Sequence, residues 1–325
     1  PVRGEDFVNA LVLGIEVECR IGNAVFPAHY DVGWHITGTA GVFGAAAAVG
    51  KLLELDAEHM AWALGIAASQ PVGLREMFGS MTKSFHPGRA AQNGMTAALL
   101  ASKGYTSSGQ ALEAKCGWLN VLSTSHDASQ ITTNLGKTYE ISSNSYKPFA
   151  CGIVIHPVID ACLQLRKLEH VEADAVQAVA LRVHPLVLEL TGKTEPRSGL
   201  ESKFSVYHAA AVALCEGDGG EHQFSDRAVL DPAVVNVRRH VSASVDPELD
   251  TDAAHVEVTL KDGRVLRRHV EHAIGSMLRP MSDTDLERKF IGLTEEALGE
   301  IRTRRLLDAC WSIEHFEEVA AIAAA

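Results

Sequence analysis

The segment Gly79-Ser-Met-Thr-Lys-Ser-Phe-His-Pro-Gly-Arg-Ala-Ala-Gln-Asn-Gly94 carries more structural and chemical information than any other part of this chain. It places Lys83, His86 and Arg89 within seven residues of otherwise small or apolar sequence. A Pro-Gly pair between the histidine and the arginine is expected to interrupt the backbone, and an alanine-rich helical pattern follows. We therefore predict a loop that delivers cations to the start of a helix, where unpaired N–H groups bind anions readily.

These local cations contrast with the acidity of the whole chain. The 325 residues carry a formal net charge of −12, and an acidic surface disfavours nucleic acid and anionic membranes as partners. The longest apolar runs, such as Gly41–Gly50, are shorter than the ~20 residues of a membrane span, and no signal peptide is visible. We expect a cytoplasmic protein in which the Lys83 segment binds a small anionic substrate.

Neither the cysteines nor the histidines show the spacing of a disulfide or metal site. The six cysteines form no CxxC pair and lie mostly in apolar surroundings, which predicts buried, reduced thiols. The 15 histidines include no HExxH or comparable ligand spacing, so we predict no bound metal. The sequence also lacks GxSxG, Walker A and strand-linked GxGxxG motifs, which argues against hydrolase, nucleotide and dinucleotide sites.

The N-terminal part of the chain is predicted to be helical. Its small residues are so dense that tightly packed helices are favoured over a sheet core. Asp56 is a plausible N-cap, and Gly104 is a C-cap signal. The predicted helices span Glu5–Ile21, Gly38–Leu55, Ala57–Ser69, Arg89–Lys103 and Ser107–Trp118.

The middle of the chain mixes helix and strand signals after a turn-rich stretch, Ser142–Gly152. Lys261-Asp-Gly263 lies between two alternating runs and is a strong hairpin signal, and Gly217 ends a helical pattern. The predicted elements are helices at Ile153–Leu168 and Lys203–Glu216 and strands at Val176–Val183, Ala254–Leu260 and Arg264–Val270.

Helices return at the C-terminal end, at Asp283–Ile291 and at Thr294–Ile313, with Thr294 as the expected N-cap. The fold class is therefore mainly α with an α+β part. We expect a large all-helical domain over residues 1–145, a smaller α+β lid domain over 146–273, and a return to the helical domain over 274–325. Because the chain opens directly on a helical pattern, we also expect the natural protein to have more sequence upstream.

Four segments carry side chains suited to acid–base chemistry. In Tyr30–Gly41, His35 and Thr37 lie among glycines, and Gly33 and Gly38 are expected to leave room for a ligand. The others are the Lys83 segment, a Tyr-Lys-Pro-Phe turn followed by a histidine, and a lysine–tyrosine pair at the head of an alanine-rich helix. Their candidate residues are Lys83, His86, Arg89, Lys147, His156, Lys203 and Tyr207.

Each segment, taken alone, has a purely structural alternative. These alternatives are a buried hydrogen-bonded histidine, a solvated basic turn, a linker lysine and a surface lysine–tyrosine pair. Together, however, the residue types suit proton transfer on a polycarboxylate. Lysine and arginine hold carboxylates, and histidine or tyrosine moves a proton at the adjacent carbon. Lysine also stabilises the enolate-like charge that develops, so this chemistry requires no metal and no cofactor.

Taken in order, these segments resemble the 2-methylcitrate dehydratase (MmgE/PrpD) family. The matching pieces occur in family order across nearly the whole chain, and the ordered set is more specific than any single piece. They are Gly33–Gly41, Thr82–Gly94, Tyr146–Phe149 with His156-Pro157, Lys203–Tyr207, and Arg279–Ser282 with Lys289-Phe290.

The resemblance implies a large helical domain, a smaller α+β lid and a homodimer, which we expect to form through the helical domain. Family members include 2-methylcitrate dehydratase, cis-aconitate decarboxylase and iminodisuccinate epimerase. They act on small di- or tricarboxylates in a cleft between the domains, without a metal. Carried over by position, His35, Lys83, Lys147 and Tyr207 are the expected catalytic residues. The expected substrate-binding residues are Thr37, His86, Arg89, His156 and Lys203.

Three departures from the family pattern leave the substrate open. Family members carry an upstream helical segment that supplies an aspartate and a histidine to the pocket, and Pro1 aligns with the end of that segment. Gly152 stands where decarboxylase-type members have a histidine. The Lys-Ser-Phe-His-Pro-Gly-Arg segment also differs from the Lys-Ser-Trp-Ala-Ala-Gly type of the methylcitrate dehydratases.

The leading hypothesis is a cofactor-independent dehydratase that acts on a methylcitrate-like polycarboxylate. In it, Lys83 and Lys147 anchor carboxylates, His35 is the general acid or base, and Tyr207 donates a proton or orients the substrate. The alternatives are an epimerase or isomerase of an iminodisuccinate-like dicarboxylate, a decarboxylase of cis-aconitate, and an inactive fragment.

Overall fold

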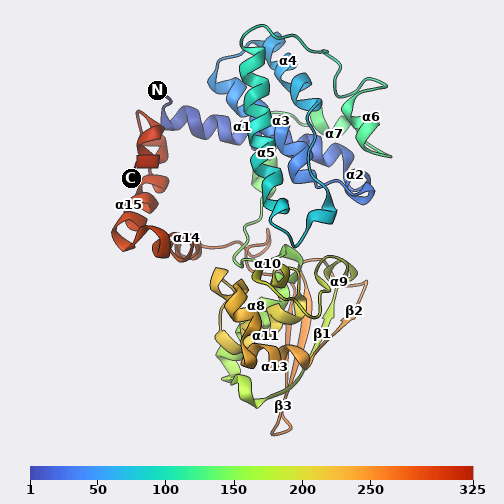
Figure 1. The fold of residues 1–325 in the computed structure, drawn as a ribbon, viewed down its shortest axis with the longest axis vertical. Coiled ribbons are helices and arrows are strands. Elements are labelled where there is room, and N and C mark those ends of the chain that lie inside the picture. The colour runs from blue at the N-terminus through green and yellow to red at the C-terminus, as the bar shows by residue number, and fades with distance from the viewer. Residues whose placement is uncertain (325) are drawn as a thin grey trace. The chain divides into compact units, whose positions relative to one another are not determined.

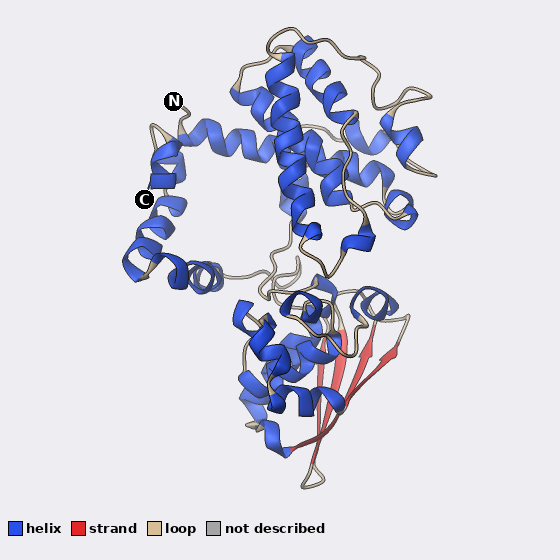
Figure 2. Ribbon diagram, in the orientation of Figure 1, coloured by secondary structure: helices blue, strands red, loops and turns tan. Residues whose placement is uncertain are grey.

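A computed structural model describes residues 1–324, which form two compact units (Figure 1, Figure 2). The first unit comprises Pro1–Asn144 and the C-terminal residues from Asp308 onward, and the second comprises Ser145–Leu307. The first unit is helical, whereas the second combines helices with one four-stranded sheet. The predicted fold class, mainly α with an α+β part, is therefore confirmed. Within residues 1–324, every helix is too short or too polar to cross a bilayer.

The first unit is built on three long helices that pack closely through small residues. They are α1 (Gly4–Val25), α3 (Ile36–Leu52) and α5 (Thr82–Ala101). A Cβ built on Gly14 of α1 would lie only 2.9 Å from the carbonyl oxygen of Gly44 on α3. The glycines therefore let the two backbones approach to a distance that any larger side chain would prevent. This confirms the close packing that the many small residues of the N-terminal part predict.

Shorter elements complete the first unit around a core that includes Phe43 and Trp118, whose rings meet edge to face at 5.2 Å. Phe43 is fully buried on α3, so it anchors the short helix that begins at Trp118. The shorter elements are α2 (Ala28–Val32), α4 (Ala57–Ala68), α6 (Trp118–Leu122), α7 (Ser129–Thr132), and the 3₁₀ turns η1 (Arg75–Met77), η2 (Glu140–Ser143), η6 (Ile313–His315) and η7 (Val319–Ala324).

A buried ion pair on α1 fixes the irregular segment that follows α7. Glu16 and Arg20 lie one helical turn apart, and both side chains are buried. The Arg20 guanidinium donates to the carbonyl oxygens of Thr133 (2.8 Å) and Thr138 (2.9 Å), and Glu16 accepts from the Glu140 N–H at 2.6 Å. Buried charges are tolerated only with such partners. The pair therefore ties this segment to α1.

Two predictions for the first unit are wrong. The Lys83 segment is not a loop, because α5 begins at Thr82 and continues through Pro87 to Ala101. A proline this close to a helix start removes its own N–H, and the helix can continue at the loss of that one bond. Residues 107–117 are turns rather than a helix, since the chain doubles back and the Trp118 N–H reaches the Ala111 carbonyl at 2.8 Å.

The second unit contains a mixed sheet with strand order β2-β1-β3-β4. β1 (Val176–Val183) pairs in parallel with β2 (Val241–Val245) and antiparallel with β3 (Ala254–Leu260), which forms the predicted hairpin with β4 (Val265–Val270). Gly263 adopts φ +89° in the hairpin turn, a conformation that favours glycine.

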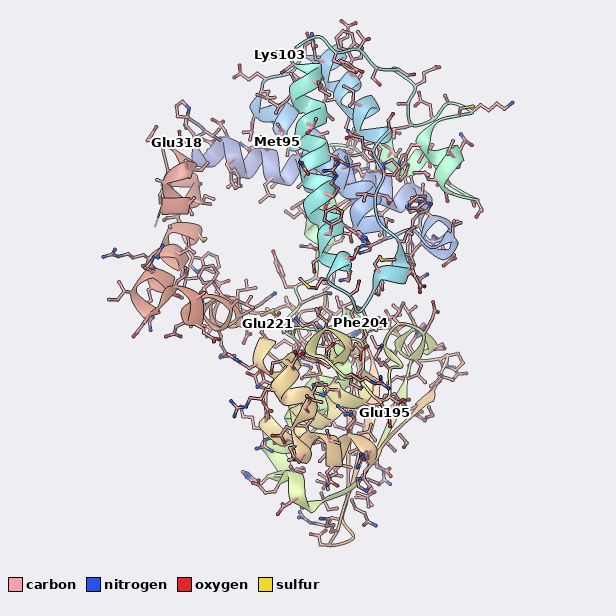
Figure 3. The ribbon with its side chains drawn as sticks, in the orientation of Figure 1. Met95, Lys103, Glu195, Phe204, Glu221 and Glu318 are labelled. Atoms are coloured by element: carbon pink, nitrogen blue, oxygen red, sulfur yellow. The ribbon has the colours of Figure 1, made fainter. Side chains whose placement is uncertain are left out.

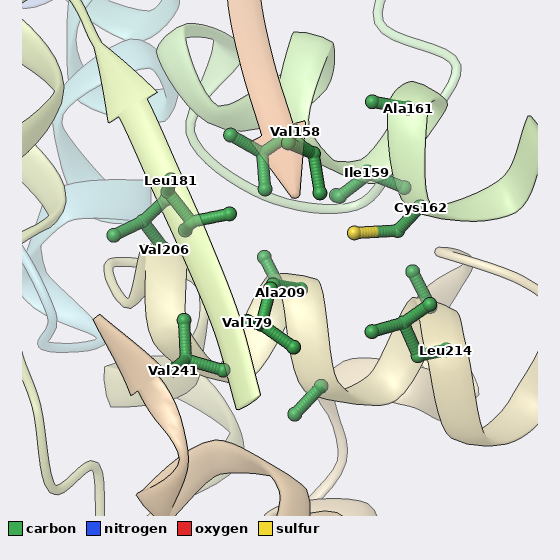
Figure 4. Close-up of a cluster of buried hydrophobic side chains, with 14 of the residues drawn as sticks. Val158, Ile159, Ala161, Cys162, Val179, Leu181, Val206, Ala209, Leu214 and Val241 are labelled. Atoms are coloured by element: carbon green, nitrogen blue, oxygen red, sulfur yellow. The ribbon is translucent and has the colours of Figure 1, made fainter. Parts of the chain in front are cut away.

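One face of the sheet packs against helices to form the core of the second unit. Val179 and Leu181 of β1 meet side chains of α8 (His156–Glu169) and α11 (Val206–Glu216), as the close-up in Figure 4 shows. The remaining elements are α9 (Pro185–Thr191), α10 (Gly199–Ser202), α12 (Asp226–Leu230), α13 (Pro232–Arg239), α14 (Asp283–Leu298), α15 (Glu300–Trp311, which crosses into the first unit), and the 3₁₀ turns η3 (Ile153–Ile155), η4 (Ala173–Ala175) and η5 (Glu221–Phe224).

Capping residues correct two predicted helix starts. The helix predicted from Lys203 begins at Val206, because the Ser205 hydroxyl caps it by accepting from the His208 N–H. Thr294 is not an N-cap: α14 runs through it from a capping box at Ser282, and the Thr294 hydroxyl donates to the Phe290 carbonyl at 2.8 Å.

Candidate functional site

The first unit contains a pair of hydrogen-bonded histidines. His35 is the residue before α3, His86 lies in the second turn of α5, and both are buried. Their Nδ1 atoms are 2.9 Å apart. The His35 backbone is held by its N–H, which donates to the Gly73 carbonyl at 3.0 Å next to the bridge between Trp34 and Leu74. Residues that are far apart in the sequence are thus held in one rigid contact.

Two glycines make this contact possible, because they let the Val72-Gly73 segment approach both α3 and the His86 ring of α5. Gly73 adopts φ +115°, and a Cβ there would lie 2.9 Å from the His86 ring. A Cβ at Gly38 would lie 2.1 Å from the Val72 carbonyl oxygen and 3.2 Å from the His86 Cβ. The space at Gly38 is therefore filled by protein, and the prediction that it leaves room for a ligand is wrong. Gly33 has no neighbouring atom within 4 Å of its Cβ position.

An aromatic ring and a lysine complete this cluster. Phe78 meets the His35 ring edge to face at 5.0 Å, and the Lys83 ammonium lies 5.6 Å from the centre of the same Phe78 ring. Lys83 is in the first turn of α5, one turn before His86. The sequence did not point to Phe78 or Gly73, since both lie outside the residues that carry acid–base chemistry.

The environment keeps both histidines neutral. Burial, and then the positive charge of Lys83, lower the pKa of His35 to about 4, well below its ordinary value of 6.5. The same two causes, in the same order, lower the pKa of His86. At neutral pH the pair is therefore uncharged, and one imidazole is free to act as a base.

Two other predicted residues of this unit lie apart from the histidine pair. Thr37 is exposed in the first turn of α3. Arg89 is exposed on α5, and its guanidinium donates to Gln92 on the same helix at 2.7 Å. The structure thus brings together His35, Lys83 and His86, and it does not place Thr37 or Arg89 in that contact.

In the second unit, Lys147 and His156 share one backbone carbonyl. The Lys147 ammonium lies 3.5 Å from the Cys151 carbonyl oxygen, and the His156 ring is hydrogen bonded to the same residue. The buried His156 also meets Phe149 edge to face at 5.3 Å. Burial, and then Lys147, lower the pKa of His156 to about 3, and burial is the main cause that lowers the pKa of Lys147.

Lys203 reaches the same turn through its backbone. Its carbonyl oxygen accepts from the Gly152 N–H at 3.0 Å, while its ammonium forms an ion pair with Glu221 at 2.7 Å (Glu221 is labelled in Figure 3). Tyr207, in the first turn of α11, is half-buried and packs against the apolar core of the unit. Lys147, His156 and Lys203 therefore gather around Cys151-Gly152, and Tyr207 lies on the neighbouring helix.

Comparison with known proteins identifies the family. The model of the MmgE/PrpD N-terminal domain matches residues 1–131, and that of the MmgE/PrpD C-terminal domain matches residues 149–313. The chain belongs to the MmgE/PrpD family. The resemblance seen in the sequence is therefore confirmed.

Curated relatives in the family are cis-aconitate decarboxylases. The chain is 27% identical over 342 residues to the Aspergillus terreus enzyme (strain NIH 2624 / FGSC A1156). This match covers 98% of this chain and 70% of the relative. The chain is 25% identical to the Mus musculus and Homo sapiens enzymes, over 331 and 329 residues, each covering 97% of this chain and 67% of the relative. Identity at this level supports lyase chemistry in the MmgE/PrpD family without fixing the substrate.

In this MmgE/PrpD chain, residues 1–324 contain no group of three or more histidine, cysteine, aspartate or glutamate side chains placed to hold a metal ion. The side chains with acid–base potential are instead the two histidine–lysine clusters, one in each unit. In the cluster of His35, Lys83 and His86, two buried imidazoles lie in direct contact, with their Nδ1 atoms 2.9 Å apart.

Proposed function

We propose that this chain is a cofactor-independent lyase that acts on a small di- or tricarboxylate by general acid–base proton transfer. The observation that carries the proposal is the buried, neutral His35–His86 pair beside Lys83. Membership of a family that contains decarboxylating lyases supports the same class of reaction.

The proposed roles follow from the state of each side chain. A neutral imidazole at His35 can remove a proton from a carbon next to a carboxylate, because the lowered pKa leaves a lone pair available at neutral pH. Lys83 is the proposed anchor for that carboxylate and stabilises the enolate-like charge that develops. In the second unit, Lys147 is the second proposed carboxylate anchor, and Tyr207 is the proposed proton donor or orienting hydroxyl.

Two bond cleavages remain candidates, each with its own support. Loss of water from a methylcitrate-like acid uses both proton removal and proton delivery, and the family resemblance implies that Gly152 stands where decarboxylase-type members have a histidine. Loss of CO2 from cis-aconitate is the activity named for the curated relatives. We favour water loss. We also propose a homodimer through the helical unit, as the family resemblance implies.

The direct test is proton NMR of the protein in D2O with 2-methylcitrate, citrate, cis-aconitate and iminodisuccinate. Formation of an unsaturated product with loss of water supports the proposal and names the substrate. Loss of CO2 replaces dehydratase by decarboxylase within the lyase class. Deuterium incorporation without elimination identifies an epimerase, and no reaction with any acid, at enzyme concentrations well above trace, overturns the proposal.

Two substitutions test the assigned roles. His35→Ala should lower kcat by roughly 10²–10⁴-fold, the usual contribution of a general acid–base residue, with KM nearly unchanged. Lys83→Ala should raise KM for carboxylates and also lower kcat, because Lys83 is proposed both to anchor the carboxylate and to stabilise the charge that develops. Arg89→Ala is the matched control, because Arg89 is an exposed cation on the same helix as Lys83. Wild-type kinetics in both His35→Ala and Lys83→Ala would contradict the assignment.

A further inference from the structure

We propose that His35 and His86 form a single proton relay, in which the two imidazoles hold opposite tautomers and pass one proton between their Nδ1 atoms. His86 is then a partner in proton transfer rather than a carboxylate-binding residue. The chemical use of the relay rests on the proposed function, whereas its geometric premise can be tested on the protein alone.

The distance between the rings dictates how the protons are arranged. A neutral imidazole has one N–H and one bare nitrogen. Two nitrogens 2.9 Å apart are at hydrogen-bond distance, so one proton lies between them. The ring that supplies this proton has a bare Nε2, and the ring that accepts it carries its own proton on Nε2. At any moment the pair therefore offers one base and one acid, each at an Nε2 atom.

Packing keeps the two rings in this contact. The backbone of Gly73 lies against the His86 ring, and the edge-to-face contact with Phe78 lies against the His35 ring. Both histidines are buried, and the Trp34–Leu74 bridge and the His35-to-Gly73 hydrogen bond tie the segment of His35 to the Gly73 backbone that lies against the His86 ring. Rotation of either ring would break the Nδ1 contact and leave a buried nitrogen unpaired, which is costly.

The surrounding charge makes transfer through the pair favourable. Burial and the nearby Lys83 disfavour a positive charge on either ring. An imidazole that takes up a proton at Nε2 can return to neutrality by releasing its Nδ1 proton to the other ring. The other ring, which has now accepted a proton at Nδ1, stays neutral if it gives up its own proton at Nε2. Uptake at one ring is thereby coupled to delivery from the other.

For the proposed water loss, this coupling balances the reaction. The bare Nε2 takes the proton from the carbon next to the carboxylate, and the C–H electron pair becomes the new C=C bond. The C–O bond breaks, and the leaving hydroxide takes the Nε2 proton of the second ring and departs as water. The shared proton moves across the Nδ1 contact, so both rings end neutral with exchanged tautomers, and solvent exchange at the two Nε2 atoms restores them.

The first test is ¹⁵N NMR of histidine-labelled protein without substrate. We expect a scalar coupling between the Nδ1 atoms of His35 and His86, with one Nε2 protonated and the other bare. His29 is an internal reference, because its Nδ1 lies 2.8 Å from the Leu122 carbonyl and must carry its proton. Identical tautomers in the two rings, or no coupling in well-resolved spectra, would overturn the relay whatever the enzyme activity.

The second test is His86→Asn, whose side-chain amide can still hydrogen bond to the His35 Nδ1 but cannot pass a proton on. We expect kcat to fall about 10²-fold or more, with KM nearly unchanged. In the unmodified protein, a plot of rate against the D2O fraction should be curved, because two protons move together. In His86→Asn the same plot should be linear. A second variant, His86→Gln, guards against misfolding specific to one substitution. Wild-type kcat in a folded His86→Asn protein would overturn the relay and leave His35 as the sole base.

Discussion

At the scale of single residues, the charge of Lys83 adds to burial in lowering the pKa of His35. Lys83→Met replaces the charged lysine by an uncharged side chain of similar length. The pKa of His35 should then rise from about 4 towards its ordinary value of 6.5. The rise should be partial, since burial is the larger cause and remains. Histidine NMR titration measures this directly. Arg89→Gln on the same helix is the control, and an equal shift in that variant would show that the effect is not specific to Lys83.

The residue types of this cluster could be predicted from the sequence, but their pairing could not. His35, Lys83 and His86 belong to segments whose composition suits acid–base chemistry. The contact between His35 and His86 spans 51 residues and depends on Gly73 and on the bridge beside it. Neither the approach of Gly73 nor the bridge beside it has a local sequence signal. Thr37 lies only two residues after His35 but is exposed in the first turn of α3, because a helix turns successive side chains in different directions.

At the scale of elements, the packing of α3 against α5 predicts opposite effects for two glycines of α5. A Cβ at Gly94 would lie 2.5 Å from the Ala45 Cβ and from the Val42 carbonyl oxygen, whereas at Gly88 there is no atom within 4 Å. Gly94→Ala should therefore destabilise the protein by about 1–3 kcal/mol, because α3 and α5 must separate. Gly88→Ala should stabilise it by about 0.5–1 kcal/mol through helix propensity.

Urea unfolding of both variants, followed by helical circular dichroism, measures these changes. Each variant adds one methyl group to the same helix. The difference between their unfolding free energies therefore separates the effect of the α3–α5 contact from the effect of helix propensity. A Gly94→Ala protein that is as stable as Gly88→Ala would contradict the close approach of α3 and α5.

Elements with strong local signals could be predicted, and those decided by competing or distant signals could not. The Asp-Gly hairpin and the Asp56 cap lie where expected, and the Asp56 side chain accepts from the His59 N–H. The Pro-Gly pair in α5 is a strong breaker signal that the helix overrides through its packing on α3. β2 (Val-Ser-Ala-Ser-Val) does alternate apolar and polar residues, but it was not predicted because it is only five residues long and its central apolar residue is an alanine, which is a weak strand former.

At the scale of the whole molecule, both units bury neutral histidines, and this predicts acid lability. The pKa values of His35 and His208 are lowered to about 4 and that of His156 to about 3, with burial as the largest cause in each. In the unfolded chain these groups regain their ordinary value of 6.5. Above that value neither state binds the protons, so the full stability is present. Below it the unfolded chain binds more protons than the folded one, and stability is lost as the pH falls.

The window of this loss runs from about pH 6.5 down to the folded-state values near 4 and 3. Between pH 7 and pH 5, each of the three histidines should remove roughly 1–2 kcal/mol of unfolding free energy. Thermal unfolding at pH 7, 6 and 5 should show a steadily falling midpoint. In His208→Asn, which removes one titrating group from the second unit, the fall should be smaller than in the unmodified protein. A midpoint that stays constant over this range would mean that the buried histidines accept protons in the folded protein. The His35–His86 pair would then not be neutral below pH 6.5, and the proposal that it acts as a base would be contradicted.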